Sequence, residues 1–179
     1  MVTLKRKLDY EDYAGIPTDR NRHEIIDGNL FVTPAPSPLH QRVSRRLQRI
    51  LEDYFHPREV GEVFNAPIDV ILSPHDVLQP DLVLARAPQV SARGIEGPPV
   101  LVIEILSPST MRQDRNAKAR RYAELGVGHY WIVDPEARRI ECYRLVGSEY
   151  AMLIVADDDS VLAHPDWPDL SIPGANLWR

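Results

Sequence analysis

The sequence predicts an α/β (α+β) domain in which a mixed β-sheet is flanked by helices. Two helical segments alternate with groups of short extended segments along the chain. One continuous apolar stretch, residues 100–106, is typical of a central strand that is buried on both faces. Helices and strands in this order indicate helices packed on a sheet. With 179 residues, 44% of them hydrophobic, the chain suits one compact domain.

The first part of the chain predicts an arm, a hairpin and a helix. Residues 1–22 are polar and lack sustained periodicity, so we expect an N-terminal arm with one helical turn near residues 10–13. Residues 23–33 hold two short apolar runs around Asp27 and Gly28, which tolerate positive φ and predict a hairpin. After a proline-rich loop, Ser37 is expected to cap a helix that begins at Pro38. Its apolar face recurs every four residues: Leu39, Val43, Leu47, Leu51 and Phe55.

The second part of the chain predicts mainly strands. Residues 60–85 contain extended segments split by turn residues 73–76, which indicates a hairpin or a meander. Thr110 and Gln113 match a capping box for a helix that runs to Leu125 and ends at Gly126. Strands follow at 129–134 and 138–145. We expect a core over residues 23–145 and, over 146–179, an acidic C-terminal extension of the same domain with edge strands.

The composition excludes several kinds of site and predicts where the protein is located. The single cysteine, Cys142, excludes a disulfide framework and zinc sites built from paired thiolates, and it predicts a cytoplasmic location. No apolar stretch is long enough for a membrane span or a signal peptide, so no membrane association is expected. The histidines show no HExxH spacing, so a histidine-based zinc site is not expected.

The net charge of −5 speaks against a protein that coats nucleic acid through bulk positive charge, but the charge is unevenly distributed. Residues 149–179 hold six acids against one basic residue, whereas residues 1–148 are balanced. Of the 21 basic residues 18 are arginines, and beyond residue 7 Lys118 is the single lysine. A lysine kept in such a chain suggests a task for a compact ammonium group, against the alternative of an exposed residue paired with Asp114.

Two acids stand out beside apolar strands. Glu104 lies inside the central strand, where an unpaired charge costs several kcal/mol. It either pairs with an arginine at the strand end or binds a metal, and its position before Ser107 favours a metal. Asp81 opens the preceding extended segment, although Pro80-Asp81 is also an ordinary turn pair. Two carboxylates on neighbouring strands repel unless a cation lies between them, and oxygen ligands suit Mg²⁺ or Mn²⁺.

Other residues are weaker candidates. Glu24 is either a third acid of the site or a half-exposed strand residue, and His40, at the start of the first long helix, is a secondary candidate. Arginines on the two helices are candidate phosphate contacts, most of them expected on solvated faces. These arginines are Arg42, Arg45, Arg46 and Arg49 on the first helix, and Arg112, Arg115, Arg120 and Arg121 on the second.

Several strings of the sequence, in their order and spacing, resemble the Uma-type proteins of bacteria, a group assigned as endonucleases. The strings are HEIIDG, the SPLHQ helix start, GEVF, QPDLVLA, VIEILSPST, DRNAKARRY and GVGHYWIVDPEARRIECYR, which together cover residues 23–145. The core of that group is similar to the PD-(D/E)XK restriction-endonuclease fold. The resemblance therefore implies a restriction-endonuclease-like core and an endonuclease that hydrolyses DNA phosphodiester bonds.

The resemblance also implies roles for individual residues. Asp81 matches the aspartate of the PD element and Glu104 the second acid, which together with the Ile105 carbonyl would hold Mg²⁺ or Mn²⁺. The position two residues after Glu104 is Leu106 instead of lysine, and Lys118 from the following helix matches the displaced lysine. Glu24 matches an early acidic position of the family.

Two other functions remain open: a catalytically silent DNA-binding or assembly module, and a hydrolase of a smaller phosphoester. We also expect a homodimer, because nucleases of this fold often cut two strands by pairing two sites.

Overall fold

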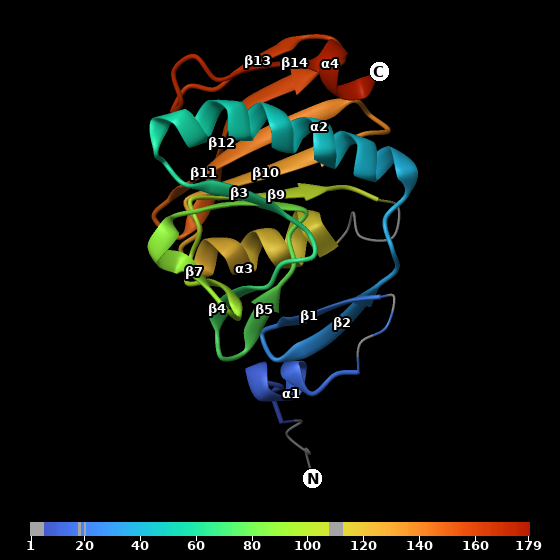
Figure 1. The fold of residues 1–179 in the computed structure, drawn as a ribbon, viewed down its shortest axis with the longest axis vertical. Helices are drawn as coiled ribbons and strands as arrows, with labels where there is room; N and C mark the ends of the chain where they lie inside the picture. Colours follow the sequence, from blue (N-terminus) through green and yellow to red (C-terminus); the bar gives the residue numbers. More distant parts are fainter. Residues whose placement is uncertain (1–5, 18, 20, 108–112) are drawn as a thin grey trace.

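Two six-stranded sheets and their helices make up the computed structural model, which describes residues 6–17, 19, 21–107 and 113–179 (Figure 1). The larger sheet has the order β12-β11-β10-β9-β6-β3. Its strands are β3 (Glu62–Asn65), β6 (Leu82–Ala85), β9 (Leu101–Ile105), β10 (His129–Asp134), β11 (Arg139–Val146) and β12 (Glu149–Asp157). Strands β9 and β10 are parallel and the other neighbours antiparallel, so the sheet is mixed, as predicted.

The smaller sheet has the order β2-β1-β5-β4-β8-β7. Its strands are β1 (Arg22–Ile26), β2 (Asn29–Thr33), β4 (Val70–Ser73), β5 (Asp76–Leu78), β7 (Val90–Ser91) and β8 (Gly94–Glu96). The predicted hairpin at Asp27-Gly28 joins β1 and β2, with both turn residues at positive φ. A two-stranded sheet pairs β13 (Val161–Ala163) with β14 (Ser171–Pro173).

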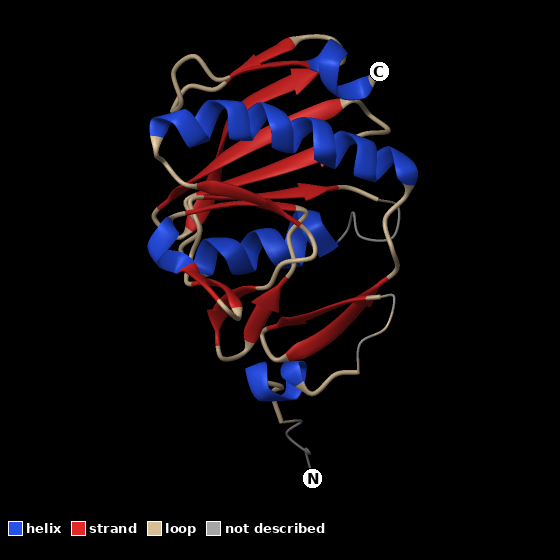
Figure 2. Cartoon of the chain, in the orientation of Figure 1, coloured by secondary structure: helices blue, strands red, loops and turns tan. Residues whose placement is uncertain are grey.

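Four α-helices and three segments of 3₁₀ or π helix accompany the sheets in the described part of the chain (Figure 2). The α-helices are α1 (Tyr10–Ala14), α2 (Pro38–Phe55), α3 (Ala119–Glu124) and α4 (Gly174–Trp178). The 3₁₀ segments are η1 (His56–Arg58) and η2 (Ala87–Gln89), and the π-helical segment η3 (Gln113–Lys118) leads directly into α3. As predicted, Ser37 caps α2, its side chain accepting a hydrogen bond from the His40 backbone N–H. Of the predicted capping box, Thr110 lies outside the described residues.

The larger sheet separates two hydrophobic layers. Helix α2 covers one face with the apolar residues predicted for it, and β13, β14 and α4 extend that layer (Figure 1). Helix α3 and the smaller sheet cover the other face. Along β9, Ile103 and Ile105 therefore face α2, while Val102 and Leu106 face α3. Alternation places the Glu104 side chain on the α3 face, and the predicted burial of this strand on both faces is confirmed.

Three details differ from the sequence-based expectations. Residues 60–85 contribute to both sheets: the turn at 73–76 joins β4 and β5, whereas β3 and β6 pair in the larger sheet. Pro67 and Pro80 lie between the strands concerned, because a proline cannot donate a hydrogen bond to a sheet. The sequence indicated one sheet, and the second forms because strands from the first hairpin and this segment pair across a long separation. The C-terminal helix α4 was not predicted.

Within the described part of the chain, no helix combines the length and the apolar character needed to cross a membrane.

Candidate active site

Asp81 and Glu104 meet at one end of the larger sheet. Strands β6 and β9 are antiparallel neighbours in which Leu82 lies opposite Ile103, and one further step along this register places Asp81 opposite Glu104. Opposed residues on antiparallel strands have Cβ atoms about 5 Å apart. Both side chains are buried, with 3% and 1% of their residues' surfaces exposed. The sheet therefore brings together the two acids that the sequence singled out.

Three groups contact the carboxylate of Asp81. Its Oδ1 accepts a hydrogen bond from Arg22 Nη2 at 2.8 Å, and its Oδ2 lies 3.1 Å from His40 Nε2. The Ile105 backbone N–H donates to the same Oδ2 at 2.8 Å. Burial alone would raise the pKa of this carboxyl, but the His40 hydrogen bond, the Arg22 charge and the Ile105 amide lower it to about 2. Asp81 is therefore ionised at neutral pH.

Lys118 lies between the other two acids. Its Nζ is 2.9 Å from Glu24 Oε1 and 3.1 Å from Glu104 Oε1, with 3% of the side chain exposed. Tyr122 of α3 donates its hydroxyl to the same Glu104 oxygen at 3.0 Å. Burial, reinforced by the charge of Glu104, raises the pKa of Tyr122 well above its usual range, so the hydroxyl keeps its proton. The last residue of η3 thus supplies the buried ammonium group that composition singled out.

Glu24 joins the site through the smaller sheet. It lies on β1 and is 1% exposed, and its Oε1 also accepts a hydrogen bond from the Gln79 backbone N–H at 2.9 Å. Of the two interpretations of Glu24, the structure supports a third acid and not a half-exposed strand residue. The three acids of the cluster therefore come from β1, the start of β6 and β9.

Arg22 is the main residue that the sequence interpretation missed. It had been assigned to the N-terminal arm, yet it opens β1 and its side chain is 18% exposed. Burial lowers the pKa of its guanidinium group, but the charges of Asp81, Glu104 and Glu24 raise it above the ordinary value. Its position next to His23-Glu24 was the available signal. The cluster thus combines three acids with Arg22 and Lys118, and His40 also contacts Asp81.

Most of the candidate arginines do not reach the cluster. Arg46 donates to the Leu177 carbonyl, and Arg42 and Arg49 lie on the exposed side of α2. Arg121 forms a two-pronged hydrogen bond to Asp76, with Nε–Oδ1 2.7 Å and Nη2–Oδ2 2.6 Å, so its expected phosphate contact is replaced by a structural pair. Arg120 pairs with Glu124 and is exposed. Arg112 and the side chain of Arg115 lie outside the described residues.

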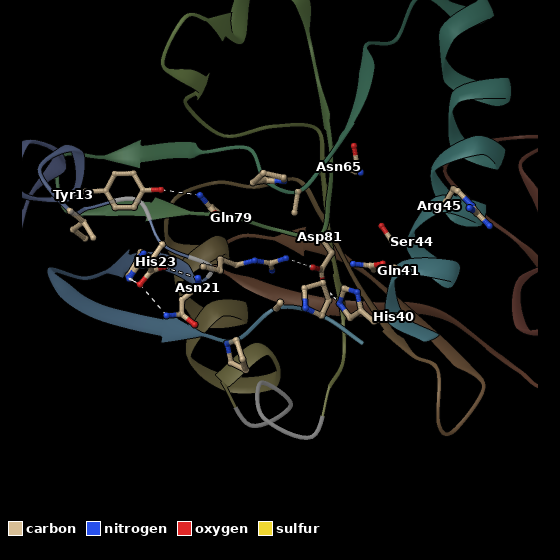
Figure 3. Close-up of a pocket in the computed structure, with 18 of the residues that line it drawn as sticks. Tyr13, Asn21, His23, His40, Gln41, Ser44, Arg45, Asn65, Gln79 and Asp81 are labelled. Atoms are coloured by element: carbon tan, nitrogen blue, oxygen red, sulfur yellow. Dashed lines mark hydrogen bonds and ion pairs between the residues drawn. The ribbon is translucent and has the colours of Figure 1, made fainter. Parts of the chain in front are cut away.

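A cavity of about 830 Å³ reaches the cluster from the side of Asp81 (Figure 3). Arg22, His40 and Asp81 form its inner end, and Figure 3 shows His40 beside Asp81, with Gln41 and Ser44 nearby. The Nδ1 atom of His40 is buried and has no hydrogen-bond partner in the described chain. Of the three acids, Asp81 is the one that lines the cavity.

The oxygen donors of this cluster fit a hard divalent cation. In the described residues, no group of three or more His, Cys, Asp or Glu side chains is arranged to hold a metal by itself. Mg²⁺ does not require such a cage, because it usually keeps several waters and takes one or two carboxylates. Asp81 and Glu104 lie opposite each other on neighbouring strands, and each contacts a cationic side chain. They would supply the two carboxylates that such an ion needs.

Comparison with known proteins assigns the chain to a class of restriction-endonuclease-like nucleases. Residues 9–175 match the model of a family described as "Putative restriction endonuclease". The chain belongs to this family, Uma2, which confirms the resemblance seen in the sequence.

Two similar proteins extend the comparison. The chain is 31% identical over 142 residues to the uncharacterized protein slr1290 of Synechocystis sp., covering 76% of this chain and 74% of that protein. A crystal structure described as a "putative nuclease belonging to DUF820" from Anabaena variabilis superposes with a TM-score of 0.76 at 18% identity, covering 96% of this chain and 97% of that one. At this identity the likeness establishes the fold, and the predicted fold class is confirmed.

Proposed function

We propose that this protein is an endonuclease that hydrolyses DNA phosphodiester bonds with Mg²⁺ or Mn²⁺. The observation that carries the proposal is the buried cluster at the end of β6 and β9, where Asp81 opposes Glu104 and Lys118 Nζ lies 3.1 Å from Glu104 Oε1. Membership of the Uma2 family supports the same conclusion. Asp81, Glu104 and the main-chain carbonyl of Ile105 would hold the metal. When bound, such a metal lowers the pKa of a water molecule and neutralises charge on phosphate oxygens.

The residues of the chain prepare this site for hydrolysis. Asp81 stays ionised because His40, Arg22 and the Ile105 amide stabilise its charge. Lys118 is held between Glu24 and Glu104, where its ammonium group can orient a water molecule and share charge that develops on the phosphate. Glu24 holds Lys118 in place and is available to position a second water. Arg22, at the inner end of the cavity, is placed to contact a phosphate that enters it.

A plasmid assay tests the proposal. Supercoiled plasmid is incubated with the protein and Mg²⁺ or Mn²⁺, beside Asp81→Asn and Lys118→Met. We expect nicked and linear products from the wild type and a loss of about a hundredfold or more in each variant, because changes even outside the metal ligands cost 10- to 100-fold. Glu62→Gln is the matched control, since Glu62 is exposed and lies at the end of β3 that is distant from Asp81.

The outcomes separate the proposal from its alternatives. Plasmid that stays intact with every metal, but is retarded on a gel by wild type and variants alike, would leave a DNA-binding or assembly module. Turnover of a small phosphoester panel without any effect on DNA would indicate a hydrolase of smaller esters. Circular dichroism of each variant shows whether it folds, so that a loss of activity is assigned to the site.

We also propose that the protein works as a homodimer, since two sites are needed to cut both strands of a duplex. Light scattering after size-exclusion chromatography measures the mass. A mass near 40 kDa is expected from the 20.4 kDa chain, and a mass that stays at one chain even with DNA would contradict the proposal.

A further inference from the structure

One wall of the cavity beside Asp81 is a polar stripe on α2, defined here as Gln41, Ser44, Arg45 and Gln48. Their spacing of three, four and seven residues places them on one side of the helix, next to the apolar face that packs on the sheet. The stripe extends over about 10 Å of helix. It ends beside His40 at the inner end of the cavity, and so leads directly to Asp81.

The rest of the lining includes an aromatic ring and apolar side chains beside polar residues such as Asn21 and His23. The apolar groups are Tyr13 and Ile16 of the N-terminal arm and prolines, including Pro34, Pro36 and Pro67. In Figure 3, Tyr13 lies across the cavity from Gln41 and Ser44, with Asp81 between them. Tyr13 is held there by its hydroxyl, which donates to Asp69 Oδ1 at 2.6 Å and accepts from Gln79 Nε2 at 2.9 Å. The arm therefore has a fixed place opposite α2.

Several polar groups on the cavity wall have no partner within the protein. The side chains of Gln41, Ser44, Arg45 and Asn65 make no hydrogen bond or ion pair with the rest of the described chain. The buried His40 Nδ1 is likewise without a partner there. Gln41, Arg45 and Asn65 are exposed and Ser44 is half-buried, so water satisfies these groups in the free protein, and a ligand that enters the cavity can replace that water. Of this set, the buried His40 Nδ1 is the atom for which a missing partner itself indicates a ligand.

The shape excludes one way of contacting DNA. A helix that reads a duplex must protrude into a major groove about 12 Å wide. The polar stripe of α2 instead forms one side of a concavity whose other side is the arm. A cavity of about 830 Å³ is within the range of sites for nucleotide-sized ligands, which is roughly 300–1,000 Å³. The stripe is thus placed to contact a group that enters the cavity.

We propose that this cavity binds an unpaired nucleotide of the DNA strand, next to the phosphate that lies at Asp81. The base would stack on Tyr13 and the prolines, and its edge would bond to the amides of Gln41 and Asn65. Arg45 and Arg22 would contact the flanking phosphates. This inference rests on the proposed nuclease function and adds a preference to it: the substrate strand is single-stranded, frayed or flipped out at the cut.

Fluorescence anisotropy in EDTA tests the site without metal or turnover. A labelled 12-nucleotide single strand is compared with its blunt duplex at one salt concentration. We expect the wild type to bind the single strand about tenfold more tightly, because stacking and edge contacts need an unpaired base. Ser44→Trp, which fills the cavity from the α2 side, should remove that preference.

A charge-matched pair keeps the test specific. Arg45→Ala should weaken single-strand binding about tenfold, as expected for the loss of a charged hydrogen bond. Arg49→Ala removes the same charge one turn further along α2, outside the cavity, and should change binding less than about twofold. Equal losses in both variants would indicate general electrostatic attraction and would overturn the proposal.

The remaining outcomes distinguish this inference from the proposed function. If the duplex binds as tightly as the single strand and Ser44→Trp and Arg45→Ala leave binding unchanged, the cavity does not take a nucleotide, even if plasmid is cut. If single-strand binding is preferred and is lost in both variants while no DNA is cut with Mg²⁺ or Mn²⁺, the cavity proposal stands and the nuclease proposal fails.

Discussion

Two groups of buried charges in this protein look alike in the sequence and differ in the structure. Asp76 is 0% exposed and is matched by one arginine, Arg121, with further hydrogen bonds from Ser73 Oγ and the Asp27 backbone N–H. The second group, which we call the acid cluster, consists of Glu24, Asp81 and Glu104 with Arg22 and Lys118. Neither Asp76 nor Arg121 lines the cavity, whereas Asp81 and Arg22 of the acid cluster do.

The comparison shows how an acid held by one arginine differs from an acid that lies in a cluster of acids beside a cavity. A carboxylate whose oxygens are all engaged by a single two-pronged arginine is satisfied, and little is gained by exchanging that partner. In the acid cluster, three carboxylates lie close together, and one of them, Asp81, lines the cavity, where a further positive charge can reach it. Burial alone does not separate the two cases, because both acids are almost completely buried.

The largest contrast is expected in activity. Glu104→Gln should lower plasmid cleavage about a hundredfold or more, since it removes a proposed metal ligand. Asp76→Asn is the same chemical change in the other group and should keep the rate within about threefold below its melting temperature, because Asp76 has no part in the site. Initial rates of nicking at 20 °C measure both, and similar losses would remove the distinction between the groups.

Stability should show the opposite order. Asp76→Asn removes the two-pronged charged partner of Arg121, which then keeps only the more exposed Glu124 and Asp27, and should cost about 3 kcal/mol, or about 9 °C in melting temperature. Glu104→Gln weakens the contact with Lys118, but Glu24 still holds that ammonium group and the repulsion among the three acids falls, so the cost should be smaller, about 1 kcal/mol. Thermal unfolding followed by circular dichroism gives both values. A larger loss for Glu104→Gln would mean that the acid cluster is primarily structural.

A divalent metal should stabilise the fold through the acid cluster and not through the Asp76 group. At a Mg²⁺ or Mn²⁺ concentration ten times the dissociation constant, about 1.4 kcal/mol of stabilisation is expected, which corresponds to a rise of about 4 °C. The rise should persist in Asp76→Asn and disappear in Asp81→Asn. Melting curves with and without metal test this, and an unchanged rise in Asp81→Asn would exclude Asp81 as a ligand.

Acidification should lower the stability of the fold in two separate pH ranges, one set by His164 and the other by the carboxylates. Burial, with the charge of His129, lowers the pKa of His164 to about 4 from 6.5. Between these values the unfolded chain binds more protons, so stability falls as the pH drops from 6.5 to 4. Asp81, with a pKa lowered to about 2, stabilises the fold above its unfolded value of 3.8, and this contribution is lost below it.

Urea unfolding at pH 7, 5 and 3 separates the two effects. His164→Gln should flatten the decline between pH 7 and 5 and leave the decline toward pH 3, because the carboxylates are unchanged. If the variant keeps the full loss between pH 7 and 5, His164 is not its source.

Local patterns in the sequence were enough for most elements. The Asp27-Gly28 turn, the Ser37 cap and the four-residue spacing of α2 act over a few residues, so they are visible without the fold. The continuous run of apolar residues in β9 likewise predicted that this strand is buried. What the local patterns could not show is which strands pair: residues 60–85 divide between two sheets, and the arginine at position 22 reaches an acid 59 residues away.

The sequence by itself determined the composition of the site: Asp81 and Glu104 beside apolar strands, and one lysine retained among arginines. Tertiary structure decided how these charges are shared. Register across β6 and β9 opposes the two acids, η3 inserts Lys118 between Glu24 and Glu104, and β1 brings Arg22 to Asp81. Arg121 hydrogen-bonds Asp76 and does not reach the acid cluster. The reason is physical: a buried charge is stabilised by whichever opposite charge the packing brings within hydrogen-bond distance, and sequence spacing does not record that distance.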